Sequence, residues 1–254
     1  MAQRCLVTGA SSGIGAALAR RLAHRGVEVW LAARRTDALE RAVQEITAAS
    51  GKAHALQLDV SNPEETERTV RELDESVGGI DVVIANAGIG GGAIPVAELT
   101  LAEARRVLDT NLTGALATIL PLVPRMVERG RGHIVGISSL AAEIPLPAAA
   151  HYGTSKAALS FFLECAACDL HPRGVDVTIV HPGFVRTPLT DKNSFPMPFM
   201  VELERAAEII DHGIASRARW VRFPFPLRAA ITSSKAMPTA LRNAIVNRAR
   251  PPEG

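Results

Sequence analysis

The sequence is poor in cysteine and aromatic residues, and neither sign of charge dominates it. Three cysteines in 254 residues cannot supply a disulfide framework, and so low a number is typical of a reducing compartment. The formal net charge is only +2, which gives no reason to expect a nucleic-acid partner. The first residues lack the pattern of a secretory signal, and no uninterrupted apolar run reaches about 18 residues. We therefore expect a cytoplasmic protein without a transmembrane helix.

Apolar residues make up 47% of the chain, enough for one large core, and we expect a single domain over residues 1–254. Short apolar runs alternate with longer segments of helical pattern. The expected strands cover residues 4–8, 27–33, 53–59, 81–85, 133–137, 175–181 and 220–223. Helices are expected at 13–24, 36–49, after 61–65, at 99–126 and at 152–170, and two prolines at 121 and 124 predict a bend or an early end in the long one. This alternation predicts an α/β fold of Rossmann type, a doubly wound parallel sheet of about seven strands with helices on both faces.

A glycine-rich segment joins the first expected strand to the first helix. It reads Thr8-Gly9-Ala10-Ser11-Ser12-Gly13-Ile14-Gly15, a Gly-x-x-x-Gly-x-Gly spacing. Glycines at such a junction let backbone N–H groups approach a pyrophosphate, and the helix N-terminus adds the positive end of its dipole. An ordinary strand–helix turn is the alternative, but the position favours a dinucleotide-binding loop.

The second expected strand ends in Ala32-Ala33-Arg34-Arg35. A site selective for NAD places an acid there, to accept a hydrogen bond from the 2′-hydroxyl of the ribose. Two guanidinium groups without a carboxylate suit a 2′-phosphate, so the sequence favours NADP, with NADPH preferred over NADH. Solvated arginines before a helix are the alternative.

Tyr152 and Lys156 lie four residues apart on an expected helix, and Tyr152 is the only tyrosine in the chain. Residues at this spacing share a helix face, where an ammonium group lowers the pKa of a phenol toward the range useful for acid–base catalysis. Upstream of Tyr152, Ile137-Ser138-Ser139 ends a strand at the edge where open α/β sheets bind ligands, and a serine hydroxyl there could hydrogen-bond a substrate oxygen. Asn111 falls within a long helix, where an amide has no propensity advantage.

Together these segments resemble the short-chain dehydrogenase/reductase family over at least residues 4–190. The resemblance rests on the order and spacing of the loop 8–15, Leu58-Asp59-Val60, Asn86-Ala87-Gly88, Asn111, Ser139, Tyr152 with Lys156, and Pro182-Gly183-Phe184-Val185-Arg186-Thr187. Ala85 departs from the pattern, which often has asparagine there, and this puts one strand-stabilising bond in doubt. The resemblance implies an oxidoreductase that interconverts a carbonyl and a secondary alcohol by hydride transfer with NADP(H).

The resemblance also assigns roles to single residues. Tyr152 would be the general acid and base, Ser139 would orient the reacting oxygen, Lys156 would lower the tyrosine pKa and bind the nicotinamide ribose, and Asn111 would hold a water in a proton relay. Asp59 would accept a bond from the adenine amino group, Asn86 would support the central strand, and Val185 and Thr187 would contact the nicotinamide carboxamide. The cofactor-binding set implied is Gly9, Ser11, Ser12, Gly13, Ile14, Gly15, Arg34, Arg35, Asp59, Val60, Asn86, Ala87, Gly88, Tyr152, Lys156, Pro182, Gly183, Val185 and Thr187.

Other features have weaker functional interpretations. Cys165 and Cys168 form a C-x-x-C late in a helix, which favours small core or interface residues, and without a second pair we expect no metal site. His151 either lines the site or is a spacer at the helix start. Residues from about 189 to 215 are expected to form a substrate lid, whose Phe and Met content indicates an apolar substrate.

The C-terminal segment is strongly basic. Residues 213–254 contain eight basic side chains and one acidic side chain, and residues 224–254 are expected to form a basic helical extension. A membrane surface or an acidic partner could bind it, or it could pack as a helix on the substrate side. A catalytically idle dinucleotide-binding module that uses this tail is therefore the second hypothesis. The resemblance further implies a homodimer or homotetramer built on the long helices, including residues 157–167.

Overall fold

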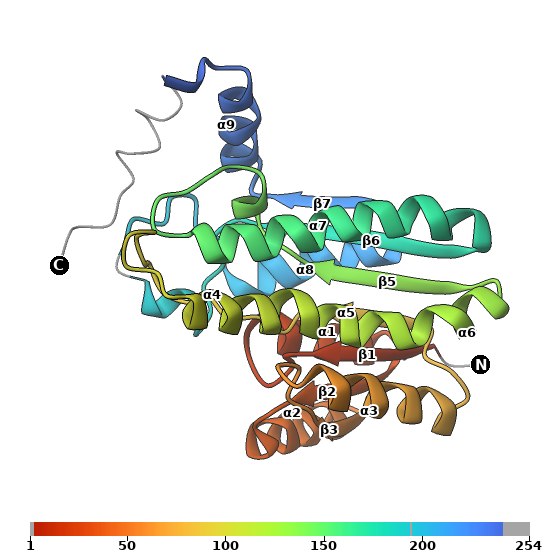
Figure 1. Ribbon diagram of the computed structural model, residues 1–254. Helices are drawn as coiled ribbons and strands as arrows, with labels where there is room; N and C mark the ends of the chain where they lie inside the picture. The colour runs from red at the N-terminus through yellow and green to blue at the C-terminus, as the bar shows by residue number, and fades with distance from the viewer. Residues whose placement is uncertain (1–2, 194, 241–254) are drawn as a thin grey trace.

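The computed structural model describes residues 3–193 and 195–240 and has one seven-stranded parallel sheet, in the order β3-β2-β1-β4-β5-β6-β7 (Figure 1). The strands are β1 Arg4–Thr8, β2 Glu28–Ala33, β3 Lys52–Gln57, β4 Val82–Ala85, β5 Gly132–Ile137, β6 Val175–Pro182 and β7 Trp220–Phe223. The predicted Rossmann-type fold is confirmed, and the strand positions agree with those expected to within two residues at each end.

Helices cover both faces of the sheet. One face packs against α1 (Gly13–His24), α2 (Thr36–Ala48) and α8 (Leu203–Ala215), and the other against α3 (Pro63–Ser76), α5 (Gly114–Ile119), α6 (Val123–Glu128) and α7 (Ala150–Leu170). Alternate strand residues therefore enter two separate cores: Val7 and Leu31 belong to the first, and Leu6 and Trp30 to the second. Burial on both faces explains why the strands are nearly continuous apolar runs.

Local signals set several helix ends. Asn62 caps α3 by accepting a hydrogen bond from the Glu65 backbone, and Pro63 occupies the first helical turn. The helix α4 (Leu101–Leu108) begins at a reciprocal capping box between Thr100 and Glu103. These side chains fix the entry of each helix onto the sheet, so the preceding loops end at defined places.

The long helix expected over 99–126 is composite. After α4 it widens into a π-helical turn, Asp109–Thr113, continues as α5, tightens into a 3₁₀ turn, Leu120–Leu122, and resumes as α6. The prolines at 121 and 124 change its pitch but do not end it. Leu101–Glu128 is long and apolar enough to span a membrane by length and composition alone, and side chains on its inner face, such as Ile119 and Leu122, are buried in the core.

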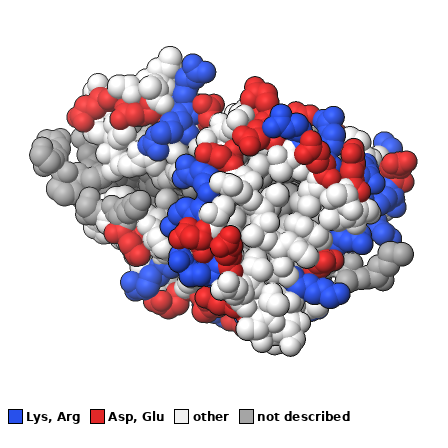
Figure 2. All heavy atoms as spheres, turned by 90° about the horizontal axis from the view of Figure 1, so that it is seen from below, with Lys and Arg blue, Asp and Glu red and all other residues white. Residues whose placement is uncertain are grey.

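A further helix, α9 (Phe225–Lys235), follows β7 and stands beyond its carboxyl end (Figure 1). Of the expected extension 224–254, residues 241–254 lie outside the described part of the chain. On the face seen in Figure 2, basic and acidic side chains are intermingled, in keeping with the near balance of charge in the sequence.

Candidate functional site

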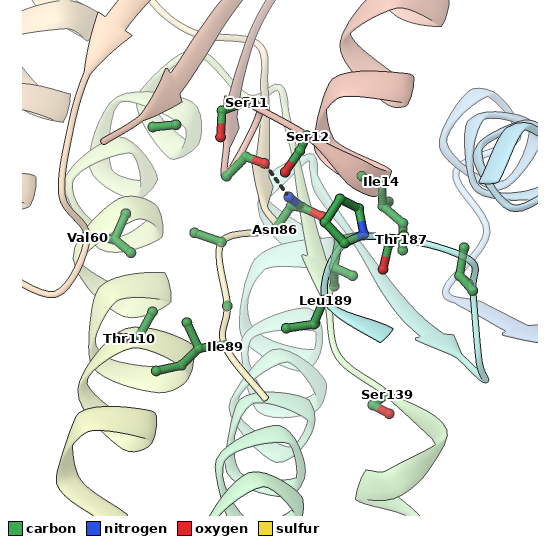
Figure 3. A pocket seen from close by; sticks show the side chains of 18 of the residues that line it. Ser11, Ser12, Ile14, Val60, Asn86, Ile89, Thr110, Ser139, Thr187 and Leu189 are labelled. Atoms are coloured by element: carbon green, nitrogen blue, oxygen red, sulfur yellow. Dashed lines mark hydrogen bonds between the residues drawn. The ribbon is translucent and has the colours of Figure 1, made fainter. Parts of the chain in front are cut away.

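The carboxyl ends of the central strands border a cavity of about 540 Å³. The loops after β1, β2, β4, β5 and β6 all contribute to its lining, which is the place where open α/β sheets bind ligands. In Figure 3, Ser11 and Ser12 lie at one end of the view and Ser139 at the other. The predicted site residues that line the cavity are Gly9, Ser11, Ser12, Gly13, Ile14, Arg34, Arg35, Asp59, Val60, Asn86, Ala87, Gly88, Ser139, Tyr152, Lys156, Pro182, Gly183, Val185 and Thr187.

The glycine-rich loop is held in place from behind by Asn86. The Asn86 amide donates to the backbone oxygens of Thr8 at 2.8 Å and of Gly9 at 3.3 Å. Gly9 has φ +66°, and a Cβ at Gly15, which does not itself line the cavity, would lie 2.7 Å from the Gly9 oxygen. Only glycine permits this approach between the loop and the helix. Asn86 directly follows β4, the neighbour of β1 in the sheet, and thus supports the loop that follows β1. Ala85, where the family pattern often has asparagine, is buried in β4.

The start of α1 is open to the cavity. Its N-cap residue, Ser12, has extended backbone angles, and no described side chain caps the helix. The N–H groups of the first turn therefore stay available to an anion, and the helix dipole favours negative charge there. Arg35 donates to the hydroxyls of Ser11 at 3.2 Å and Ser12 at 3.4 Å, so one guanidinium lies directly against this loop.

Arg34 and Asp59 border the same end of the cavity. The Arg34 guanidinium lies 3.9 Å from one Asp59 carboxylate oxygen, and the other oxygen accepts hydrogen bonds from the backbone and hydroxyl of Ser61. Asp59 therefore holds the turn before α3 as well as facing Arg34. Both arginine side chains belong to the region where the sequence places the adenosine ribose.

At the other end, α7 carries Tyr152 and Lys156 into the cavity. Lys156 is buried, and its ammonium group donates to the Ile137 backbone oxygen at 2.8 Å. Burial lowers the pKa of Lys156 to about 8. Burial raises the pKa of Tyr152, and a hydrogen bond with the Ser139 side chain offsets this only in part. The expectation that Lys156 holds the tyrosine pKa below its usual value is therefore wrong for this structure, because desolvation of the phenol dominates.

The two neighbouring serines have different positions. Ser139 accepts a hydrogen bond from the Ala141 backbone at 3.1 Å, which caps the short turn Leu140–Ala142 and keeps its hydroxyl at the cavity. Ser138 also borders the cavity, but its buried hydroxyl donates to the Lys156 backbone oxygen at 2.9 Å. The geometry is consistent with the thirteen-residue spacing that favoured Ser139 as the residue facing a substrate.

Asn111 does not line the cavity. It lies in the π-helical turn, is fully buried, and uses its amide to accept from the Ile89 backbone at 2.7 Å and to donate to the Ile89 oxygen and the Ser155 hydroxyl. Its side chain therefore fixes the loop after β4 and is committed to protein partners. The implied role of Asn111 in holding a water stays a prediction. π-Turns of this kind are frequent at functional sites.

Sequence reasoning missed part of the lining. Ile89, Thr110 and Leu189 border the cavity (Figure 3). Leu189 lies at the start of the expected lid, whereas Ile89 and Thr110, next to Gly88 and Asn111, had no signal of their own. These three residues come from segments distant in the sequence, and only the tertiary structure brings their side chains to the same cavity.

The features with weaker interpretations also have defined places. Cys165 and Cys168 are exposed, so the core interpretation is wrong, and the described residues contain no cluster that could hold a metal. His151 is buried against Gly91 instead of lining the cavity. Of residues 189–215, where a substrate lid is expected, Leu189 and Thr190 border the cavity, and residues 203–215 form α8, which packs on α1.

Comparisons with known proteins agree with this geometry. The sequence profile of the short chain dehydrogenase family matches residues 3–196. An uncharacterized oxidoreductase of Myxococcus xanthus is 44% identical over 245 residues, 96% of each chain. A short-chain dehydrogenase from Sphingobium yanoikuyae, solved in complex with NADPH, superposes with a TM-score of 0.83 at 25% identity and covers 99% of this chain and 98% of its own. A metagenomic short-chain oxidoreductase in complex with NADP gives a TM-score of 0.76 at 31% identity, over 88% of this chain and 97% of its own. The chain therefore belongs to the short-chain dehydrogenase family of oxidoreductases.

Proposed function

We propose that the protein is an NADP(H)-dependent oxidoreductase that interconverts a carbonyl and a secondary alcohol, with Tyr152 as the general acid and base. One observation carries this proposal. Tyr152, Ser139 and Lys156 meet at one end of a cavity whose other end is formed by an open helix N-terminus and two arginines. A nicotinamide dinucleotide needs both ends, an anion site for its phosphates and a proton-handling site beside its nicotinamide.

The residues present are suitable for this cofactor. The first turn of α1 leaves its N–H groups to the pyrophosphate, because no described side chain caps it. The close approaches at positions 9 and 15 leave no room for a side chain, since a Cβ would lie 2.8 Å from the Ala87 Cα and 2.7 Å from the Gly9 oxygen, and a glycine-rich turn of this kind suits a pyrophosphate. Arg34 and Arg35 supply positive charge for a 2′-phosphate, and two of the similar structures carry NADPH or NADP.

When bound, the nicotinamide supplies or accepts the hydride. Tyr152 then gives its proton to the carbonyl oxygen during reduction and takes it back during oxidation. Its raised pKa keeps the phenol protonated at neutral pH, which suits an acid. Ser139 is placed to hydrogen-bond the same reacting oxygen. Lys156, which lines the same end of the cavity and is held by the Ile137 backbone oxygen, would bind the nicotinamide ribose.

Two further expectations are kept as proposals. Phe161 on the outer surface of α7 is 71% exposed, which supports a homo-oligomer built on this helix; light scattering would test it, and a monomer at micromolar concentration would contradict it. We also keep the proposal of a cytoplasmic location, which fractionation of the source cells would test, and that of an apolar substrate, since Ile89 and Leu189 line the cavity.

Tyr152→Phe with matched cofactor titrations tests the activity. NADPH and NADH are titrated into the wild type and the variant, and turnover is followed with a panel of ketones and aldehydes. We expect NADPH binding to be retained and kcat to fall by about 10²- to 10⁴-fold, the range of a lost general acid. Binding of NADPH without turnover of any carbonyl by the wild type would instead support the idle-module alternative. Turnover that survives the substitution would refute the role of Tyr152.

A further inference from the structure

Glu143 is the centre of a polar cluster that the proposed function does not use. It follows the short turn that Ser139 begins, and its side chain is only 9% exposed. Its carboxylate pairs with groups from three other elements: His181 of β6 at 2.7 Å, Arg222 of β7 at 3.2 Å and Lys235 of α9 at 3.0 Å. Burial alone would raise the pKa of Glu143, but its bonds with His181 and Lys235 outweigh burial and leave the pKa below its usual value. The carboxylate is therefore charged at neutral pH.

The cluster continues from His181 to the helix that carries Tyr152. Burial lowers the pKa of His181, so the ring is neutral, and its Nδ1 proton goes to Glu143 because a carboxylate only accepts. Nε2 of His181 is then an acceptor and takes the single hydroxyl proton of Ser160, 2.9 Å away. The Ser160 hydroxyl also lies 2.7 Å from the Ser138 hydroxyl, and both hydroxyls are within hydrogen-bond distance of the Lys156 backbone oxygen, at 2.8 and 2.9 Å, so the two serines connect this part of α7 to His181. The order of donors thus runs from α7 toward Glu143.

The contacts of Glu143 and His181 connect the segments that carry Ser139 and Pro182, both at the proposed catalytic end of the cavity. Glu143 lies at the end of the turn capped by Ser139, and His181 directly precedes Pro182 at the cavity. On the outer side, α9 packs over that segment: a Cβ at Gly183 would lie 2.8 Å from Pro224 and 2.9 Å from Leu227. Lys235 at the end of α9 is the residue through which that helix contacts Glu143.

We propose that Glu143 is a positioning residue that couples α9, through Lys235 and His181, to the placement of Ser139 and of the helix bearing Tyr152. The proposal rests on the proposed function for its kinetic consequence. Its structural consequence does not, because Tyr152 is the only tyrosine in the chain and its ionisation can be followed directly by absorbance.

Positioning and simple charge effects predict different signs for the pKa of Tyr152. The hydrogen bond from Ser139 is what lowers this pKa against burial, so loosening the turn raises it in both Glu143→Gln and Lys235→Met. A field effect alone would lower it in Glu143→Gln, which removes a negative charge, and raise it in Lys235→Met, which removes a positive one. The two explanations are therefore separable with one pair of variants.

The experiment compares wild type, Glu143→Gln, Lys235→Met and the double variant. Tyrosinate absorbance is recorded in stopped-flow pH jumps, so that the chain stays folded, and kcat, KM and NADPH affinity are measured in parallel. We expect upward shifts of the Tyr152 pKa in both single variants, a fall in kcat of about tenfold in Glu143→Gln with unchanged NADPH affinity, and a double variant no worse than Glu143→Gln alone. Glu164→Gln on the exposed surface of α7 and Lys52→Met at the opposite edge of the sheet are the matched controls.

Each outcome decides the matter. Opposite shifts in the two single variants, no shift beyond the controls, or additive effects in the double variant would overturn the proposal. If Glu143→Gln does not fold, Lys235→Met is titrated at low and at high salt instead. The field effect of a half-exposed charge is screened by salt, whereas a shift caused by a loosened turn persists, so a shift that disappears at high salt would overturn the proposal. If the wild type turns over no carbonyl, the proposed function fails, and the tyrosinate titration still decides the role of Glu143.

Discussion

Replacing Lys156 by methionine should make the apoprotein more stable at neutral pH while removing its activity. Lys156 is buried on α7, and methionine can occupy a similar volume without carrying a charge. The lysine pKa falls from 10.5 to about 8 in the folded chain. The folded state therefore bears the cost of a desolvated ammonium group that the unfolded chain keeps in water.

The size of this cost follows from the shift. The difference between 10.5 and about 8 corresponds to roughly 3 kcal/mol at about 1.36 kcal/mol per pKa unit. Below about pH 8 both states hold the proton and the full cost is present. Between pH 8 and 10.5 the unfolded chain holds the proton and the folded chain does not, so the free energy of unfolding rises with pH. In the variant this dependence is absent. The lost bond to the Ile137 oxygen opposes the gain, and it weakens in the wild type as the lysine loses its charge.

Urea denaturation of the wild type and Lys156→Met without cofactor, from pH 7 to 10.5, measures the effect. The difference in unfolding free energy between the two proteins should change by roughly 3 kcal/mol across this range, and the variant should be favoured most at pH 7. Taking the difference cancels the other titrating groups. A difference that stays constant with pH would refute the argument that burial of Lys156 dominates its titration.

The remaining predictions concern the dinucleotide end of the cavity. Replacing Arg34 and Arg35 together by alanine should weaken NADPH by about tenfold or more and NADH by much less, because charge-assisted bonds to a 2′-phosphate are lost; fluorescence titration measures both, and equal losses would remove the basis for NADP preference. Gly15→Ala should reduce stability and cofactor affinity despite the better helix propensity of alanine, because its Cβ would meet the Gly9 oxygen at 2.7 Å. Gly153→Ala in α7, whose Cβ would meet its nearest neighbour at 3.5 Å, is the control and should be neutral or stabilising by about 0.5–1 kcal/mol in thermal unfolding; equal destabilisation by both substitutions would show that close approach is not the reason.

Much of the fold was predictable because its signals are local. The apolar strands, the Asn62-Pro63 helix start and the glycine-rich junction each act within a few residues, and parallel strands with right-handed crossovers leave few arrangements. The helix 101–128 was harder to predict, since the pitch changes at Asp109–Thr113 and Leu120–Leu122 depend on packing against α3, α7 and the loop after β4. The prolines at 121 and 124 predicted a bend or an early end, and the structure has a 3₁₀ turn there, Leu120–Leu122, before α6 begins.

The candidate site divides in the same way. The sequence by itself determined the phosphate loop, the arginine pair and the Ser139, Tyr152 and Lys156 spacing, because strand ends and helix periodicity dictate where those residues lie. The tertiary structure alone decided that Asn111 is committed to Ile89, that burial raises the pKa of Tyr152, and that Glu143 joins β6, β7 and α9. Those outcomes depend on desolvation and on hydrogen bonds between residues distant in sequence, and no local pattern encodes either.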